Sequence, residues 1–295
     1  GVYGYAAFST LVAERMSDAG NFDDFPNRVG TGAIKWEPEH LKAKFGVSDV
    51  LPMWVADMDF ETAPCVVEAL KKRLEHPLFG YPRVFERYRQ AVIAWFESQH
   101  GWQIEQPWIC HAPGIVAAMN LLIQALTTPG DKVVIQPPVY YPFFGSVRDN
   151  GRELLLNTLK IDGEGLYQID FDQLEEQLAD DKTRLFMLCN PHNPGGRVWA
   201  RQDLISLVEL CIRYDVVVLS DEIHCDLVWS PFKHLPLPLA DKRILEQCVV
   251  CTASSKSFNL AGLQTSDIII PSASLRRKYR AQLHRSGLSD HNIMG

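Results

Sequence analysis

Short apolar segments alternate with amphipathic ones along much of the chain. From about residue 107 onward, several runs of four to six residues are nearly continuous in apolar side chains and rich in Val and Ile. Such runs are typical of strands that are covered on both faces of a sheet. They predict strands at Lys132–Gln136, Glu153–Leu156, Arg184–Cys189, Val216–Ser220, Cys248–Thr252 and Asp267–Ile270.

Segments with a helical period lie between and before these strands. In Arg201–Tyr214, for example, apolar residues recur at three- and four-residue spacings, which places them on one face of a helix. The predicted helices are Pro64–His76, Phe85–His100, Gly114–Thr127, Phe171–Ala179 and Arg201–Tyr214. Strands that alternate with helices predict an α/β domain with a mostly parallel sheet. The stretch Phe22–Pro52, rich in Gly, Pro and Asp, is predicted to be irregular.

Composition and charge exclude several classes of protein. The 295 residues are 46% hydrophobic and 22% charged, which is typical of a soluble globular protein. A formal net charge of −7 disfavours a nucleic-acid or anionic-membrane partner. No apolar run reaches the roughly 18 residues that a bilayer-spanning helix needs. Gly1–Gly20 shows no secretory leader, so we expect a cytoplasmic protein.

The seven cysteines are odd in number and follow no spacing typical of secreted proteins. Cys248 and Cys251 have the C-x-x-C spacing of metal and redox sites, but they lie within a predicted strand. Two buried small hydrophobic residues are therefore the default interpretation of that pair. Reduced thiols agree with a cytoplasmic location.

One lysine stands directly after a predicted strand, in CTASSKSFNLAG. Ligands of open α/β sheets bind at the carboxyl ends of the strands, where Lys256 is expected to lie. A partly desolvated amine can condense with an aldehyde there, and the hydroxyls of Ser254 and Ser255 can hold a phosphate. The alternative is an ordinary surface lysine in a polar turn.

Other polar residues follow other predicted strands. Asp221, in LSDEIHCDLVW, can pair with a protonated ring nitrogen, or it can cap a turn or form a solvated acid pair with Glu222. His224 can reach the same ring, although a lone histidine is more often structural. Asn193, in LCNPHNPGGRVW, can donate to a phenolate oxygen or serve as a plain turn residue.

Two further segments lie at the end of a predicted strand or the start of a predicted helix. In HAPGIVAAMN, Gly114 precedes a helix whose first N–H groups can bind phosphate. In QPPVYYPFF, an aromatic residue held by prolines can stack on a flat ring, or it can belong to the core. The chain contains no HExxH, GxSxG or P-loop motif, so no metal site is predicted.

Taken together, these motifs resemble those of fold-type I pyridoxal-phosphate enzymes, the aminotransferase class I/II superfamily. Within it, the chain is most similar to MalY/PatB-type cystathionine β-lyases. The resemblance covers roughly residues 22 to 290 and is carried by LPMWVADMDF, FGYP, PGIV, PPVYYPF, NPHNPGGRVW, SDEIHCDLVW and SSKSFNLAGLQTSDIIIP. His224 matters most, because ordinary aminotransferases usually have tyrosine at that place.

The resemblance implies pyridoxal 5′-phosphate as the cofactor and Lys256 as the catalytic residue. Lys256 would bind the cofactor as a Schiff base and then move the substrate's Cα proton. Asp221 would keep the pyridine nitrogen charged, Asn193 would bond the phenolic oxygen with His224 beside it, and Tyr140 would stack on the ring. The phosphate would be held by the backbone of Ile115 and Val116 together with Ser255 and Ser254.

The resemblance also implies a homodimer with a shared active site, in which Tyr81 reaches the phosphate of the neighbouring subunit. Trp54, Ala56 and Asp57 would line the substrate side. The family's usual phosphate-clamping arginine is replaced by Gln264, so hydroxyls and backbone amides must hold the phosphate. The implied domains are an extension at 1–21, an arm with part of the small domain at 22–62, a cofactor-binding large domain at 63–285, and the start of a truncated C-terminal small domain at 286–295.

The predicted activity is a C–S β-lyase that converts cystathionine or related cysteine conjugates to a thiol, pyruvate and ammonia. The substrate is therefore a small amino acid. One alternative is an aminotransferase of the same superfamily. A second is a non-catalytic regulatory protein that keeps the cofactor site.

Overall fold

The computed structural model describes residues 25–289, 292 and 294. These residues form two compact units. The first contains 25–79, Phe258–Gly262 and Met294, and the second contains Gly80–Ser257, 263–289 and 292. The extension predicted at 1–21 lies outside the described residues, and the bounds 22–62, 63–285 and 286–295 remain predictions.

The second unit is built on a seven-stranded sheet with the order β1-β9-β8-β7-β6-β2-β3. From β8 to β3 all neighbours pair in parallel, whereas β9 is antiparallel to both β8 and β1. The mostly parallel α/β sheet predicted from the sequence is thus confirmed. The strands are β1 (Ile109–Ala112), β2 (Lys132–Ile135), β3 (Glu153–Leu156), β6 (Thr183–Cys189), β7 (Val217–Asp221), β8 (Cys248–Thr252) and β9 (Ser266–Ile269), and a separate ribbon pairs β4 (Lys160–Ile161) with β5 (Tyr167–Gln168).

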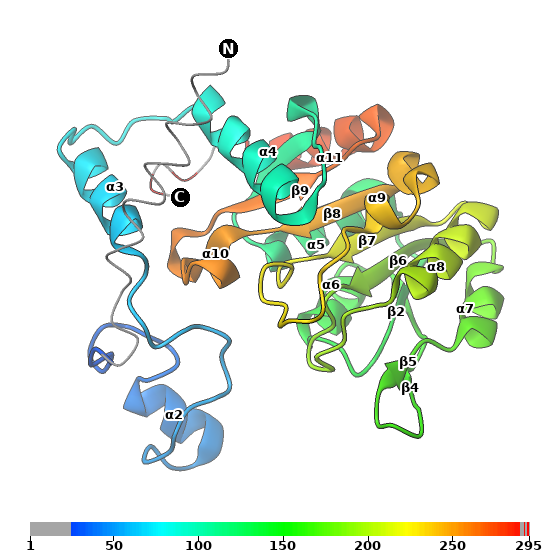
Figure 1. Ribbon diagram of the computed structural model, residues 1–295, viewed down its shortest axis with the longest axis horizontal. Helices are drawn as coiled ribbons and strands as arrows, with labels where there is room; N and C mark the ends of the chain where they lie inside the picture. Colours follow the sequence, from blue (N-terminus) through cyan, green and yellow to red (C-terminus); the bar gives the residue numbers. More distant parts are fainter. Residues whose placement is uncertain (1–24, 290–291, 293, 295) are drawn as a thin grey trace. The chain divides into compact units, whose positions relative to one another are not determined.

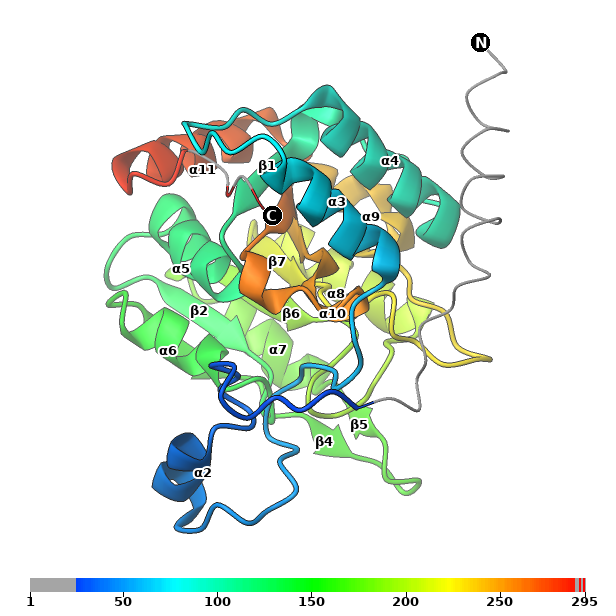
Figure 2. The ribbon, with the colours of Figure 1, turned by 90° about the vertical axis from the view of Figure 1, so that its left-hand side faces the viewer.

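Helices cover both faces of this sheet (Figures 1 and 2). One face packs against α5 (Ile115–Leu126), α6 (Pro142–Arg148) and α11 (Ala273–Arg285). The other packs against α4 (Glu86–His100), α7 (Phe171–Leu178), α8 (Arg201–Arg213) and α9 (Leu237–Ala240). The short elements are η1 (Gln106–Trp108), η2 (Lys242–Glu246), α10 (Ser254–Ser257) and η3 (Ala261–Leu263), and the first unit contains α2 (Pro38–Phe45) and α3 (Pro64–Leu74).

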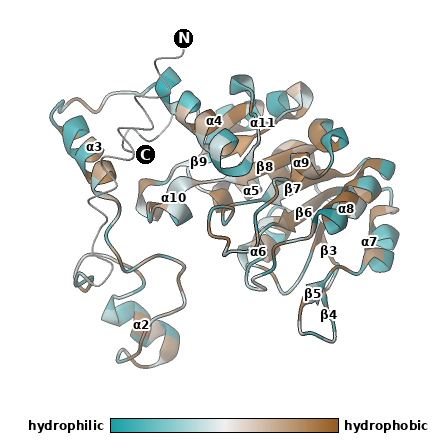
Figure 3. Cartoon of the chain, in the orientation of Figure 1, coloured by the Kyte–Doolittle hydropathy of each residue, from teal (hydrophilic) through white to brown (hydrophobic). Residues whose placement is uncertain are grey.

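Strand β6 shows why the apolar runs are continuous. Leu185, Met187 and Cys189 enter the core under α5, while Phe186 and Leu188 alternate with them into the core under α8. Both sets of side chains are buried, so from Leu185 to Cys189 no position on the strand is left for a solvated residue. Figure 3 shows the same pattern as mostly hydrophobic strands between helices with hydrophilic outer faces.

Strand β1 and helices α6 and α11 are among the elements of the second unit that escaped the sequence pattern. Strand β1 is only four residues long and includes a histidine, and α6 begins within the proline-rich aromatic run after β2. Helix α11 is strongly polar and buries only Leu275, Tyr279 and Leu283, four residues apart. In the first unit, the stretch predicted to be irregular contains α2, so that part of the prediction is wrong. Pro38 stands at its first turn, and Gly46 ends it with φ 80°.

The described helices do not include one that combines the length and hydropathy needed to cross a membrane. Cys248 and Cys251 are both fully buried in β8, which confirms the hydrophobic interpretation of the C-x-x-C pair.

Candidate active site

The predicted site residues of the second unit gather along one edge of the sheet. Strands β2, β6, β7 and β8 are parallel, and β1 shares their direction because two antiparallel pairings separate it from β8. Their carboxyl ends therefore lie on the same edge, where α/β sheets bind ligands. The segments that leave this edge carry Ile115, Val116, Tyr140, Asn193, Asp221, His224, Ser254, Ser255 and Lys256.

Asp221 is the last residue of β7, and only 3% of it is exposed. Its carboxylate accepts the N–H of Ile223 at 3.2 Å and forms no ion pair with any described residue. Burial is the largest influence and raises the pKa of Asp221 to about 7, with the charge of Glu222 acting in the same direction. The Ile223 N–H and the charge of Lys256 oppose that rise. A buried carboxylate of this kind is stabilised by a cation placed against it.

Lys256 lies in α10, which directly follows β8, the parallel neighbour of β7. Its charge affects both Asp221 and His224. Burial lowers the pKa of His224, and the positive charge of Lys256 lowers it further. The structure therefore brings the lysine, the carboxylate and the imidazole into one electrostatic environment, as the sequence predicted.

Tyr140 and Asn193 are joined by their backbones. The Tyr140 N–H donates to the Asn193 carbonyl oxygen at 3.0 Å, which ties the loop after β2 to the loop after β6. The Asn193 N–H in turn donates to Cys189 Sγ at 3.3 Å. Burial raises the pKa of the Tyr140 phenol, and the charges of Tyr141 and Asp221 add to the effect, so the tyrosine lies near Asp221. Two residues that are 53 positions apart in the sequence are thus joined at this edge of the sheet.

The start of α5 suits a phosphate. Gly114 has φ 155°, a conformation that side-chain-bearing residues rarely adopt, and no heavy atom lies within 4 Å of the place a Cβ would take. The first intrahelical bond runs from the Ala118 N–H to the Gly114 carbonyl, and no side chain caps the preceding N–H groups. The N–H groups of Ile115 and Val116 remain available for an anion. Ser255 is partly buried and Ser254 is exposed.

The remaining predicted residues lie elsewhere. Tyr81 belongs to the second unit and is 96% exposed. Trp54, Ala56 and Asp57 belong to the first unit. The Asp57 carboxylate is already paired with Arg28 at 2.7 Å.

The indole N–H of Trp54 is buried and has no hydrogen-bond partner among the described residues. An unpaired buried donor is costly, so an acceptor placed against it would be stabilising.

A buried carboxylate–histidine contact beneath the site was missed from the sequence. Glu222 accepts from Ser220 at 2.8 Å, from the Leu237 N–H at 3.0 Å, and lies 2.7 Å from His234 Nε2. The Glu222 and His234 side chains are at most 1% exposed, so the solvated acid pair considered for Asp221 and Glu222 is wrong. The sequence shows Glu222 only as one of several acids in SDEIHCD. Its partner histidine is 12 positions away, so no local pattern predicts the contact.

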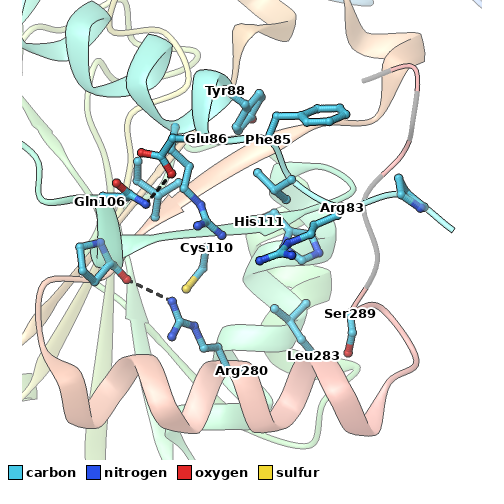
Figure 4. A pocket seen from close by; sticks show the side chains of 15 residues that line it. Arg83, Phe85, Glu86, Tyr88, Gln106, Cys110, His111, Arg280, Leu283 and Ser289 are labelled. Carbon is cyan, nitrogen blue, oxygen red and sulfur yellow. Dashed lines mark hydrogen bonds between the residues drawn. The ribbon is translucent and has the colours of Figure 1, made fainter.

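The second unit also has an open hollow of about 940 Å³ on the outer side of β1, between α4 and α11 (Figure 4). Arg83, Arg89, Arg280 and His111 line it, and none of the predicted site residues does. Arg83 and Arg89 form no ion pair within the described part of the chain. Figure 4 shows Arg280 reaching from α11 toward Cys110.

The donor set at the sheet edge fits a flat, phosphate-bearing aldehyde with a cationic ring. Lys256 supplies the amine, the start of α5 and the serine hydroxyls supply phosphate donors, and Asp221 supplies a buried carboxylate that forms no ion pair with the described residues. Tyr140 supplies an aromatic face at the same place. A site with these groups can bind a pyridoxal-type cofactor and move a proton beside it.

Comparisons with known proteins agree with this geometry. The family model for aminotransferase class I and II matches residues 48–290. The chain is 47% identical to cystathionine β-lyase PatB of Bacillus subtilis over 92% of this chain and 70% of PatB. Among solved structures, cystalysin from Treponema denticola, which contains a pyridoxal 5′-phosphate cofactor, matches with a TM-score of 0.86 at 33% identity, covering 92% of this chain and 68% of that one.

A pyridoxal-phosphate-bound C–S lyase from Staphylococcus hominis matches with a TM-score of 0.85 at 33% identity. The match covers 93% of this chain and 68% of that structure. The similarity to MalY/PatB-type enzymes that the motifs predicted is thereby confirmed. On the family match, the identity and the fold together, the chain belongs to the aminotransferase class I and II family of pyridoxal-phosphate proteins.

Proposed function

We propose that this protein is a pyridoxal-phosphate-dependent C–S β-lyase. It cleaves cystathionine or a related cysteine conjugate to a thiol, pyruvate and ammonia. The observation that carries the proposal is the buried Asp221 carboxylate, which forms no ion pair with any described residue and lies within electrostatic reach of Lys256. The 47% identity to an enzyme named cystathionine β-lyase supports the choice of reaction.

The residues at the sheet edge have separate tasks in binding the cofactor. Lys256 holds it covalently, Asp221 keeps the ring nitrogen protonated, and Asn193 and His224 lie at the phenolic oxygen. Tyr140 packs on the ring face, and Ile115, Val116, Ser254 and Ser255 bind the phosphate. When bound, pyridoxal phosphate supplies an electron sink for the electrons released at the substrate's α carbon.

The remaining chemistry belongs to the chain. Lys256 takes the Cα proton of the substrate, and a positioned base of this kind contributes about 10² to 10⁴ in rate. The elimination then releases the thiolate from Cβ, and hydrolysis of the remaining fragment gives pyruvate and ammonia. Trp54, Ala56 and Asp57 are proposed to line the substrate side.

The reaction type is decided by adding L-cystathionine without any keto acid. We expect pyruvate and ammonia in equal amounts, because elimination regenerates the cofactor without a second substrate. A strict requirement for 2-oxoglutarate would instead indicate an aminotransferase. Absorbance of a bound cofactor with no product from any amino acid would indicate a non-catalytic binding protein.

A homodimer with shared active sites is part of the proposal. Tyr81 and Phe85 are 96% and 64% exposed, and Phe85 also lines the arginine-rich hollow beside β1 (Figure 4). Exposed aromatic residues next to an open hollow are typical of an interaction surface. We propose that Tyr81 reaches the phosphate of the partner's cofactor from this surface.

Mixing two inactive variants tests the shared site. A Tyr81→Ala subunit keeps Lys256, and a Lys256→Ala subunit keeps Tyr81, so one site of each mixed dimer is complete. Random exchange of subunits should restore about a quarter of the wild-type activity, since half of the dimers are mixed and each has one intact site. If Tyr81 acts within its own subunit, mixing restores nothing.

A cytoplasmic location is also proposed. All seven cysteines are free thiols, and six of them are buried. Proteins of reducing compartments usually have such unpaired cysteines.

A further inference from the structure

Asp226 lies behind the short helix that carries Lys256. Its Oδ2 accepts the hydroxyl of Ser257 at 2.5 Å, and Ser257 is the residue directly after Lys256. Its Oδ1 lies 2.8 Å from His100 Nε2, at the end of α4. The indole N–H of Trp95, also in α4, is 3.2 Å and 3.3 Å from the two oxygens. One carboxylate thus connects the loop after β7, helix α4 and the segment after β8.

We propose that Asp226, held in place by His100 and Trp95, is a positioning residue that fixes Lys256 through the hydroxyl of Ser257. This inference rests on the proposed function of Lys256. It assigns to Asp226, His100 and Ser257 a role in the reaction although none of them needs to touch the cofactor or the substrate.

The helix that carries the lysine depends on such a contact. Helix α10 is only four residues long and none of its residues is fully buried, so packing alone holds it weakly. Isolated helices of this length are unstable in water, and tertiary contacts must hold them. The bond from Ser257 to Asp226 attaches α10, through His100 and Trp95, to helix α4. Helix α4 is itself anchored by Phe96, which is in the core. A lysine on an unattached turn would sample many positions, and misplacement by about 1 Å can cost about a hundredfold in rate.

The electrostatics of Asp226 agree with this role. Burial by itself raises its pKa, but hydrogen bonds from His100, Ser257 and Trp95 outweigh burial, and the net pKa is lowered. The carboxylate therefore stays ionised and accepts hydrogen bonds only, and a charge-assisted bond is about twice as strong as a neutral one. The Asp226 and His100 side chains are 16% and 6% exposed, so water competes weakly for these bonds.

A metal ion is the other occupant that this cluster allows. Ligand atoms of His100, Cys225 and Asp226 lie within 4.8 Å of one another. However, both oxygens of Asp226 already accept hydrogen bonds, and burial raises the pKa of the Cys225 thiol well above its usual range. A thiol that resists ionisation is a poor ligand, because metals bind the thiolate. The hydrogen-bonded arrangement is therefore preferred.

Three variants of the protein test the positioning role. Ser257→Ala removes the hydroxyl, Ser257→Thr keeps one, and Asp226→Asn removes the charge with little change in shape. A matched control is Asp180→Asn, because Asp180 also forms a 2.5 Å side-chain bond, to Lys132, but at the opposite end of the sheet. The first measurement is the rate at which added pyridoxal phosphate becomes attached to Lys256 in cofactor-free protein, followed by absorbance and by mass after borohydride reduction. The second is kcat and KM with L-cystathionine.

Ser257→Ala and Asp226→Asn are expected to slow attachment and lower kcat by at least about tenfold, with KM changed far less, since only the position of the amine is affected. The attachment rate and kcat of Ser257→Thr and Asp180→Asn should stay close to the wild-type values. The midpoints of thermal unfolding should differ little among the variants. Equal rates in Ser257→Ala and the wild type, failure of Ser257→Thr to restore the rate, or zinc bound through His100 would each overturn the inference. Wild-type protein that takes up no pyridoxal phosphate would instead contradict the proposed function.

Discussion

Replacing Lys256 with alanine is expected to abolish both the visible absorbance of the bound cofactor and the release of pyruvate. Lys256 is the amine that approaches Asp221 and His224 at the sheet edge. In the proposed function, its loss removes the covalent attachment and the base for the Cα proton together. We expect kcat to fall by about 10⁴-fold, the upper end of what one positioned proton-transfer group contributes. Intact mass after borohydride reduction and a continuous pyruvate assay measure the two effects.

The control for this change is Lys233→Ala. Lys233 is exposed and lies in the same connection between β7 and α9 as His224, but it has no part in the proposed site. It should keep the wild-type absorbance and activity. A pyridoxyl group that still becomes fixed to the Lys256→Ala protein would show that another amine holds the cofactor, and the central assignment would fail.

The central strands of the sheet were predictable because they are buried on both faces. Cys248–Thr252 is buried at every position and forms β8 with the predicted bounds. The apolar run Glu153–Leu156 also has the predicted bounds, although it forms the edge strand β3 and is only partly buried. Helix α11 was not predictable in the same way. Its burial depends on three side chains spaced along a polar sequence, and helix α5, which packs against them, is far away in the sequence.

The cofactor residues were predictable as a group because parallel strands bring their carboxyl ends to one edge. Lys256, Asp221 and His224 meet there although each alone has an ordinary alternative. The contacts behind them were not predictable. Asp226 is bonded to Ser257 and His100, which lie 31 and 126 positions away, and no periodicity relates these residues. Hydrogen-bond partners of this kind are set by tertiary geometry alone.

Replacing Asp221 with asparagine should have the second largest effect. Asparagine keeps the shape and can still accept the Ile223 N–H, but it cannot hold the ring nitrogen protonated. We expect kcat to fall by about 10² to 10³-fold, the range seen when one preorganised electrostatic group is removed. The cofactor should remain attached to Lys256. Asp267→Asn is the matched control, because Asp267 is also a buried acid near the end of the sheet but is bonded to Tyr88 at 2.9 Å.

The same carboxylate predicts how the cofactor-free protein responds to pH. Burial raises the pKa of Asp221 to about 7, well above the roughly 3.9 of an unfolded aspartate. Between these values the folded state binds more protons than the unfolded state. The free energy of unfolding should therefore be highest at the acidic end of this window and fall as pH rises through about 7.

Burial raises the pKa of Asp267 to about 7 as well, so two groups contribute with the same sign. Urea unfolding of cofactor-free protein at several pH values measures the slope. Asp221→Asn should make the slope shallower by removing one contribution, and bound pyridoxal phosphate should do the same in the wild type by placing a cation against the carboxylate. An unchanged slope in Asp221→Asn would mean that folding does not raise the pKa of this carboxylate, because a counter-charge already lies against it in the cofactor-free protein. A cationic ring would then not be needed beside Asp221.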